Sequence, residues 1–191
     1  MPFLSLAATQ GGQAPSSRRT LMQSALALLA TSAGVGTPVL AVEPGQPAPR
    51  FDLPAIRAGA GVYVPNTTVD LADYQGKTVY LDFWASWCGP CKQSFPWMNE
   101  LQARYGAKGL QVLAVNLDQR GTDARDFLIA NPARFDVAFD AKGATPTLYG
   151  IKGMPTSVLI GPTGRVLWTH TGFRPDEKAE LEQQIQKALK A

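Results

Sequence analysis

Histidine, cysteine and long apolar runs are all scarce in this chain of 191 residues. Its only histidine is His170, and its only cysteines are Cys88 and Cys91. A zinc site needs about four ligands, and one histidine far along the chain adds little to two cysteines. We therefore expect no metal site and no catalytic centre built on histidine. We expect His170 to be an ordinary surface residue near a strand end.

The chain also lacks a strong excess of charge of either sign. It has 18 Lys and Arg residues against 15 Asp and Glu residues, a formal net charge of +3. Arg18 and Arg19 lie near the N-terminus, so the remainder is nearly neutral, and it contains no basic run. These features argue against binding of nucleic acid. The apolar content of 45% is enough for one good hydrophobic core, so we expect one domain after any leader.

Residues 1–41 have the three parts of a secretory signal peptide. Arg18 and Arg19 supply positive charge, Ala25–Ala30 forms a short apolar stretch, and small residues lead up to Ala41. The apolar stretch is short for a bilayer span, which needs about 20 residues. We therefore expect cleavage after Ala41, with a retained membrane anchor as the alternative.

Ser17–Met22 also resembles the twin-arginine export signal, in which an Arg pair precedes apolar residues. An ordinary secretory route is the equal alternative. Either route places residues 42–191 outside the cytoplasm, and we expect a bacterial periplasm.

The body of the chain begins with extended segments. A Pro/Gly-rich arm is expected at 43–50, followed by a short edge segment from Phe51 and a Gly-rich turn at 58–61. Residues 62–64 and 67–69 flank Pro65-Asn66 and predict a small hairpin.

Alternating strands and helices follow these segments. The predicted strands are 78–84, 110–116, 135–139, 156–160 and 165–169, and the predicted helices are 91–105, 122–130 and 176–189. The first strand, helix and second strand form a βαβ unit, which requires a parallel pair. Pro96 should kink the first helix, and Ala179, Ile185 and Leu189 of the last helix should face the core.

Cys88 and Cys91 lie within Trp87-Cys88-Gly89-Pro90-Cys91, directly after the first predicted strand. A disulfide there closes a loop too short to restrain an unfolded chain much, so a structural role explains it poorly. The pattern favours a pair that cycles between dithiol and disulfide, over a structural bond or a metal site. The redox-active disulfide itself is the only prosthetic element we expect, with no separate cofactor.

Two separated motifs carry a family resemblance. The run Leu81–Lys92 is similar to the active-site signature of thioredoxin, and Tyr149–Thr156 is similar to the thioredoxin segment that holds the cis-proline. The leader, the arm, the Val69–Lys77 lead-in and the central insertion resemble the extracytoplasmic TlpA/ResA-like thiol-disulfide oxidoreductases. Members of that subfamily often carry an acidic residue three positions after the second cysteine, where this chain has Ser94.

The resemblance implies an α/β thioredoxin fold over residues 42–191. Its central mixed β-sheet is flanked by helices, with an N-terminal hairpin extension and a central α/β insertion at about 119–148. Cys88 is expected to be the nucleophile, because a helix N-terminus stabilises its thiolate, and Cys91 to resolve the mixed disulfide. Gly89 and Pro90 shape the start of the helix between them.

Asp82 interrupts an apolar strand between Leu81 and Phe83. Burial would raise its pKa, which suits a group that accepts the Cys91 proton, and the resemblance implies that same role. The alternative is an aspartate exposed at the pleat or the end of the strand.

A substrate platform is implied around Pro155, whose bond to Met154 the resemblance makes cis. The backbone of Met154 would then pair with an extended substrate segment, as in strand addition. Trp87, Gly153, Thr171 and Gly172 would complete a shallow apolar groove.

The expected activity is that of an extracytoplasmic disulfide reductase, because the Gly-Pro dipeptide matches the reducing thioredoxins. Its expected partners are protein disulfide substrates, with apocytochrome c cysteines among them, and a membrane thiol electron donor. The alternative is a periplasmic disulfide oxidase or isomerase. A thiol peroxidase is disfavoured because Ala85 occupies the position where peroxiredoxin-like chains carry threonine. A non-catalytic binding module is the last alternative.

Overall fold

A computed structural model describes residues 41–56 and 63–190. Backbone contacts divide the chain into residues 1–36 and 37–191, and every described element lies in the second unit. The predicted leader lies mostly outside the described residues, as does the Gly-rich turn at 58–61. Among the described residues, none of the helices is long and apolar enough to cross a membrane.

Seven strands form one mixed sheet in the order β2-β1-β5-β4-β3-β6-β7. The central strands β5, β4 and β3 are parallel, and the strands outside them pair antiparallel. The expected parallel βαβ unit is confirmed by the pairing of β3 with β4 through α1. The strands are β1 (Asp52–Ile56), β2 (Tyr63–Asp70), β3 (Thr78–Trp84), β4 (Leu110–Asn116), β5 (Asp136–Phe139), β6 (Thr156–Ile160) and β7 (Val166–Thr171).

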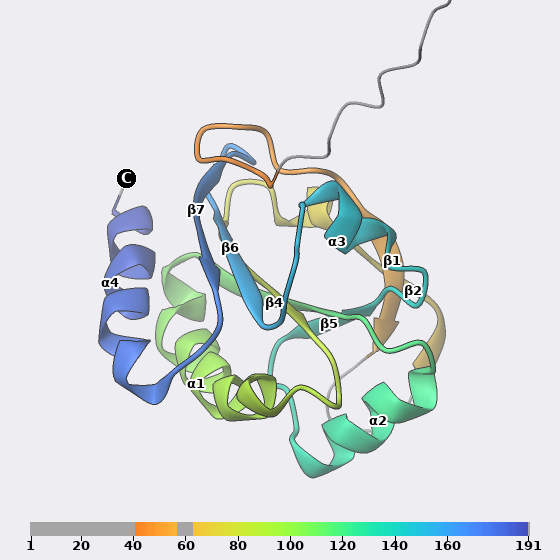
Figure 1. The fold of residues 1–191 in the computed structure, drawn as a ribbon. Coiled ribbons are helices and arrows are strands. Elements are labelled where there is room, and N and C mark those ends of the chain that lie inside the picture. The colour runs from red at the N-terminus through yellow and green to blue at the C-terminus, as the bar shows by residue number, and fades with distance from the viewer. Residues whose placement is uncertain (1–40, 57–62, 191) are drawn as a thin grey trace, which may run out of the picture. The chain divides into compact units, whose positions relative to one another are not determined.

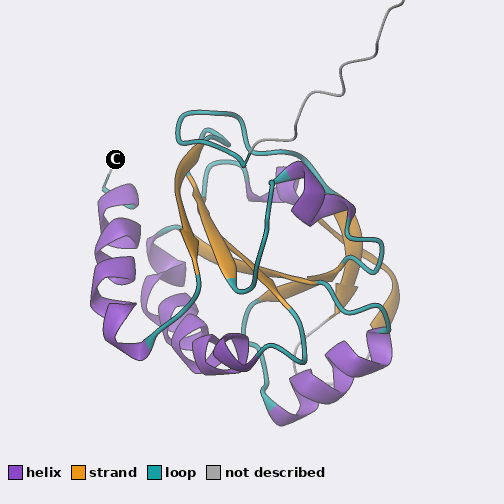
Figure 2. Cartoon of the chain, viewed as in Figure 1, coloured by secondary structure: helices purple, strands orange, loops and turns teal. Residues whose placement is uncertain are grey.

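The described residues contain four α-helices. Figures 1 and 2 show how these helices lie around the sheet. The helices are α1 (Gly89–Tyr105), α2 (Gly121–Ala130), α3 (Ala144–Leu148) and α4 (Lys178–Ala188), with short 3-10 turns at Leu71–Tyr74, Gly106–Lys108 and Pro175–Glu177. Helices α1, α2 and α4 share one buried apolar cluster with one face of the sheet. On the other face, Val42 and Phe51 of the arm and Tyr149 after α3 pack into a second cluster. The predicted thioredoxin-like α/β fold is therefore confirmed.

Strand β3 lies at the centre of this arrangement because its side chains are apolar on both faces. All seven of its residues are buried, Asp82 among them. Tyr80 and Trp84 point toward α1, and Leu81 and Phe83 point toward the arm and α3. The strand thus carries the chain directly from the core to the cysteine pair at its carboxyl end.

The hairpin predicted across Pro65-Asn66 is wrong. Residues 63–70 form one strand, β2, which pairs antiparallel with β1 and so makes the N-terminal hairpin from two longer elements. The register is regular at Pro54↔Thr68, is then interrupted, and resumes at Ile56↔Tyr63. Pro65 therefore falls in an irregular stretch of the outermost strand, where a missing backbone N–H is tolerated.

Two helical details also differ from expectation. Helix α3 lies within the predicted insertion but was not itself predicted, because Thr145, Pro146 and Thr147 favour helices weakly. In α4 the buried residues are Leu181, Ile185 and Ala188, and Ala179 is exposed. Leu181, Ile185 and Ala188 are spaced i, i+4 and i+7 and so share one face of the helix, and Ala179 does not lie on that face.

Candidate active site

Cys88 and Cys91 form a disulfide at the start of α1, with Cα atoms 5.3 Å apart. Cys88 is the N-cap residue of this helix, and its Sγ accepts a hydrogen bond from the backbone N–H of Cys91 at 3.2 Å. Gly89 and Pro90 begin the helix and are exposed, and proline at this position lacks only an N–H that has no helical partner. The predicted redox pair is therefore present as a disulfide.

The two cysteine residues differ in exposure to solvent. Cys88 is 5% exposed and Cys91 is fully buried beneath the first turn of α1. Of the two, Cys88 is therefore the residue that retains contact with solvent. The order in which Cys88 attacks and Cys91 resolves stays a prediction.

Asp82 is buried, with 1% of its surface exposed, which rules out the alternative of a solvent-exposed aspartate. Its Oδ1 accepts a hydrogen bond from the Ser157 hydroxyl at 2.7 Å, and its Oδ2 has no hydrogen-bond partner. Burial raises the pKa of Asp82 to about 7, and the hydrogen bond from Ser157 opposes that rise. A carboxyl with such a pKa can both accept and release a proton near neutrality.

The cis-proline loop lies beside the carboxyl end of β3. In the β3–β6 register Phe83 is opposite Thr156, so Met154 and Pro155 fall just past Trp84, where the chain leaves for the cysteines. The Met154–Pro155 bond is cis, as expected. The register of the sheet thus brings two motifs about sixty residues apart in sequence to one edge.

Hydrogen bonds fix the shape of this loop. Thr156 Oγ1 donates to the carbonyl of Gly153 at 2.8 Å, and the N–H of Gly172 donates to the carbonyl of Pro155 at 2.7 Å. Gly172 has φ 91°, a conformation that favours glycine. The backbone N–H and C=O of Met154 have no hydrogen-bond partner among the described residues.

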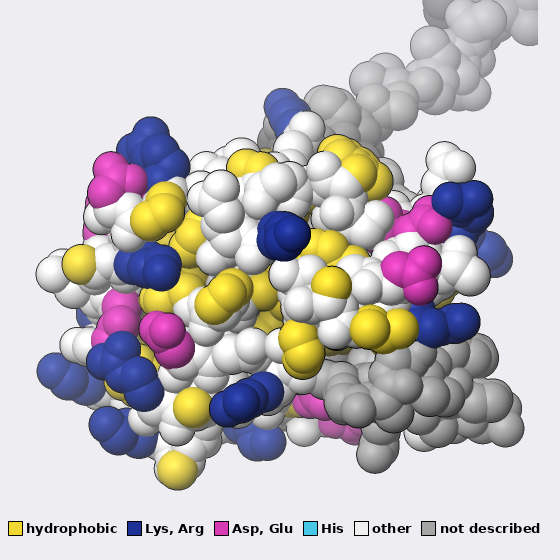
Figure 3. Space-filling model, turned by 90° about the horizontal axis from the view of Figure 1, so that it is seen from below, with side chains coloured by type: hydrophobic (Ala, Val, Ile, Leu, Met, Phe, Trp, Pro, Cys, Tyr) yellow, Lys and Arg dark blue, Asp and Glu magenta, His cyan; other side chains and the backbone are white. Residues whose placement is uncertain are grey.

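Trp87 is the most exposed large apolar side chain that the structure describes, at 73%. Met154 is half-buried and packs against the apolar cluster beneath α1. Figure 3, which views the molecule from below Figure 1, shows hydrophobic side chains exposed over the middle of the face, with Lys and Arg more numerous toward its rim. Thr171, expected in the same groove, lines a pocket of about 170 Å³ with Val42 of the arm.

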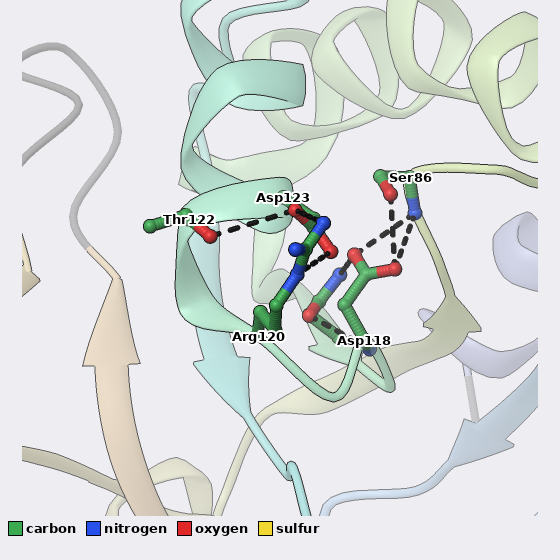
Figure 4. Close-up of polar contacts among 6 residues, drawn as sticks. Ser86, Asp118, Arg120, Thr122 and Asp123 are labelled. Carbon is green, nitrogen blue, oxygen red and sulfur yellow. Dashed lines mark hydrogen bonds and ion pairs between the residues drawn. The ribbon is translucent and has the colours of Figure 1, made fainter.

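A buried carboxylate that sequence analysis missed holds the loop before Cys88. Asp118, 2% exposed, accepts hydrogen bonds from the Ser86 N–H at 3.0 Å and from the Ser86 hydroxyl at 2.9 Å (Figure 4). Asn116 Nδ2 also donates to this carboxylate, at 2.8 Å. Asn116 is the last residue of β4 and Asp118 follows it, and the carboxyl end of β4 lies beside that of β3. That adjacency was the signal available in the sequence.

His170 is half-buried and contacts two other side chains, which differs from the ordinary surface histidine that was expected. Its ring stacks on Trp168 with centroids 5.3 Å apart, and its Nε2 lies 3.5 Å from Glu177 Oε2. In residues 41–56 and 63–190, no three His, Cys, Asp or Glu side chains gather as a metal ion would require. This edge of the sheet brings together the two cysteine sulfurs, the buried carboxyls of Asp82 and Asp118, and the backbone segment at Met154.

Comparisons with known proteins agree with this geometry. Residues 43–185 match the redoxin family. The chain is similar to the thiol-disulfide oxidoreductase ResA of Bacillus thuringiensis subsp. konkukian, 36% identical over 112 residues. That match covers 59% of this chain and 65% of the relative, so the chain spans less than two thirds of the curated protein.

The matches to solved structures cover a larger share of the chain. A crystal structure from Chlorobium tepidum, assigned as a thiol:disulfide interchange protein DsbE, is 57% identical with a TM-score of 0.72. The match covers 78% of this chain and 99% of that one. The exposed lipoprotein thioredoxin Etrx1 of Streptococcus pneumoniae is 30% identical with a TM-score of 0.61, covering 73% of this chain and 99% of that one.

Proposed function

The chain belongs to the redoxin family of the thioredoxin superfamily, and on that premise we propose that it is an extracytoplasmic thiol-disulfide oxidoreductase that reduces disulfides in other proteins. The observation that carries this proposal is the Cys88–Cys91 disulfide at a helix N-terminus, with Cys88 5% exposed and Cys91 fully buried. Similarity to a ResA oxidoreductase and to a structure assigned as DsbE supports the same activity.

In the dithiol state, Cys88 acts first. Its sulfur is the N-cap of α1, where free N–H groups and the helix dipole stabilise a thiolate. The thiolate attacks one sulfur of a substrate disulfide, and the other substrate sulfur leaves as a thiolate that takes a proton from solvent. A mixed disulfide between Cys88 and the substrate results.

Cys91 then resolves the mixed disulfide. Its thiol gives a proton to Asp82, and its sulfur attacks Cys88 Sγ, so that the bond to the substrate breaks and the second substrate thiolate leaves. The substrate has gained two electrons and, after protonation, two protons. The protein is left with the Cys88–Cys91 disulfide found in the structure.

Substrate recognition is proposed to use the cis-proline loop. An extended substrate segment would pair with the free N–H and C=O of Met154, as in strand addition. Exposed Trp87 and half-buried Met154 would supply apolar contact on either side of Cys88. Gly153, Pro155 and Gly172 would shape the backbone of this platform.

The location and the partners are part of the proposal. Residues 1–41 would export the domain 42–191, and similarity to an exposed lipoprotein thioredoxin supports a place outside the cytoplasm. A reductase in an oxidising compartment needs an outside source of electrons, for which we propose a membrane thiol donor. Apocytochrome c cysteines are the proposed substrates.

Trapping of the mixed disulfide tests the proposal. Cys91→Ser should accumulate a covalent adduct with a disulfide-containing peptide, and Cys88→Ser should form none. The wild-type dithiol should reduce the same peptide without a lasting adduct. If Cys88→Ser reduces the peptide as fast as the wild type, the proposed mechanism is wrong.

A further inference from the structure

The surroundings of Asp82 are asymmetric across the sheet. Tyr80 and Trp84 are each two residues from Asp82 in β3, so all three side chains point to the same face of the sheet. Tyr80 and Trp84 share a buried cluster with Cys91, so this is the face that α1 covers. Its neighbour on β4 is Ala114, which offers no polar group, and its neighbour on β6 is Ser157. Of the two neighbouring strands, only β6 therefore supplies a hydrogen bond to this carboxyl.

That support is a chain of two hydrogen bonds. Tyr80 Oη donates to Ser157 Oγ at 2.7 Å, and Ser157 Oγ donates to Asp82 Oδ1 at 2.7 Å. Because the tyrosine proton occupies an acceptor site of Ser157, the serine proton is directed to the carboxyl. Asp82 Oδ2 is buried and accepts no hydrogen bond. One carboxyl oxygen is thus fixed as an acceptor and the other is left open.

We propose that Ser157, held by Tyr80, is a positioning residue that makes Oδ2 of Asp82 the atom that takes the proton from Cys91. This inference rests on the proposed disulfide reduction. Oδ1 accepts from Ser157 in both protonation states, so the proton arrives at Oδ2 while the thiol S–H bond breaks. The Cys91 sulfur keeps the electron pair and forms its bond to Cys88, and the electrons of the broken mixed disulfide leave with the substrate sulfur.

Few other titratable groups face this carboxyl. Cys88 and Cys91 at the start of α1 belong to the buried cluster on this side of the sheet, and so does Tyr80 of β3, whose own pKa is raised by burial and by the nearby Asp82. On β7, His170 is opposite Ser157 in the register, one strand further away, and lies within ion-pair distance of Glu177. Strand β4 contributes only Ala114. Within residues 41–56 and 63–190, Ser157 is therefore the one group that donates a hydrogen bond to Asp82.

Removal of the Ser157 hydroxyl has a measurable consequence. The hydrogen bond favours the carboxylate, so its loss should raise the pKa of Asp82 by about one unit from its value near 7. At pH 7 the fraction of Asp82 present as carboxylate would fall about fivefold, and resolution by Cys91 would slow by the same factor. Ser157→Thr keeps a hydroxyl and should restore the wild-type pKa.

The test is a carbon-13 NMR titration of the full chain with labelled aspartate, in the disulfide form so that the cysteines do not titrate. The Asp82 signal is identified as the one that is absent from Asp82→Asn. Its titration midpoint should rise in Ser157→Ala and return in Ser157→Thr. Tyr80→Phe should raise it by a smaller amount. Tyr149→Phe, which removes another buried tyrosine hydroxyl on the opposite face, should leave it unchanged.

The outcomes separate this inference from the proposed function. An Asp82 midpoint that is the same in wild type, Ser157→Ala and Tyr80→Phe would overturn the inference, whether or not the protein reduces disulfides. A shifted midpoint in a protein that reduces no disulfide would refute the proposed function and leave the role of Ser157 in setting Asp82 intact. If Ser157→Ala does not fold, Tyr80→Phe against Tyr149→Phe decides the question.

Discussion

Replacement of Asp118 by alanine should loosen the loop that carries Cys88. Asp118 is buried and accepts hydrogen bonds from Ser86 N, Ser86 Oγ and Asn116 Nδ2 at 3.0, 2.9 and 2.8 Å (Figure 4). Alanine leaves these donors without a partner. A buried donor that loses its partner costs about 1–3 kcal/mol.

The magnitude depends on how far water can replace the carboxylate. Asn116 is fully buried, so its amide should cost about 2 kcal/mol, whereas half-buried Ser86 can be partly solvated and should cost about 1 kcal/mol. The free energy of unfolding should therefore fall by about 3 kcal/mol in total. Because Ser86 is two residues before Cys88, reduction of substrate should slow as well.

Urea unfolding of Asp118→Ala against Asp123→Ala measures this effect. Asp123 is the matched control, because it lies in the same region and forms an exposed ion pair with Arg120, at 2.9 Å (Figure 4). Its removal should leave the urea midpoint nearly unchanged. Equal midpoints for the two variants, with equal dependence on urea, would show that the Asp118 network does not hold the loop.

Three further predictions concern Asp82, Trp87 and Gly172. Burial raises the folded-state pKa of Asp82 from about 4 to about 7. Between these pH values the folded chain keeps a proton that the unfolded chain has lost, so the free energy of unfolding falls as pH rises from about 4 to about 7, by at most about 4 kcal/mol. Asp82→Asn should remove that dependence, and urea midpoints that run parallel to wild type from pH 4 to 8 would contradict it. Trp87→Ala should leave the urea midpoint unchanged, since this residue is 73% exposed. The same variant should raise KM for a protein disulfide several-fold, and an unchanged KM would show that Trp87 does not contact the substrate. Gly172→Ala should lower the free energy of unfolding by about 1 kcal/mol because φ at this position is 91°. Gly153→Ala is the control and should be nearly neutral, since no atom lies within 4 Å of the added methyl at either glycine and only Gly172 has a positive φ. Equal thermal midpoints for the two variants would refute the backbone explanation.

The features that sequence could predict depend on local pattern. Strand β3 is a continuous β-prone run, and the cysteines follow it directly, so both the strand and the position of Cys88 at a helix start could be read from adjacent residues. The burial of Asp82 could be predicted because the apolar residues Leu81 and Phe83 flank it in the strand. Its burial is confirmed, and its role stays a proposal.

The features that sequence missed depend on which strands lie side by side. Ser157 is 77 residues from Tyr80 and 75 residues from Asp82 in sequence, and only the β3–β6 register places it within hydrogen-bond distance of both. Asp118 reaches Ser86 across 32 residues through the β3–β4 pairing. No local periodicity encodes such pairs. The hairpin error at Pro65 has the same origin, because the tolerance of a proline depends on its place at the edge of the sheet.

The equilibrium redox potential of the Cys88–Cys91 pair tests the central claim most directly. The measurement equilibrates the full chain with thiol-disulfide buffers of known potential and counts free thiols at each point. If the protein is a reductase with a thioredoxin-like Gly-Pro dipeptide, the potential should lie near the thioredoxin value of about −270 mV. A potential near that of DsbA, about −120 mV, would contradict the account and make the protein an oxidase.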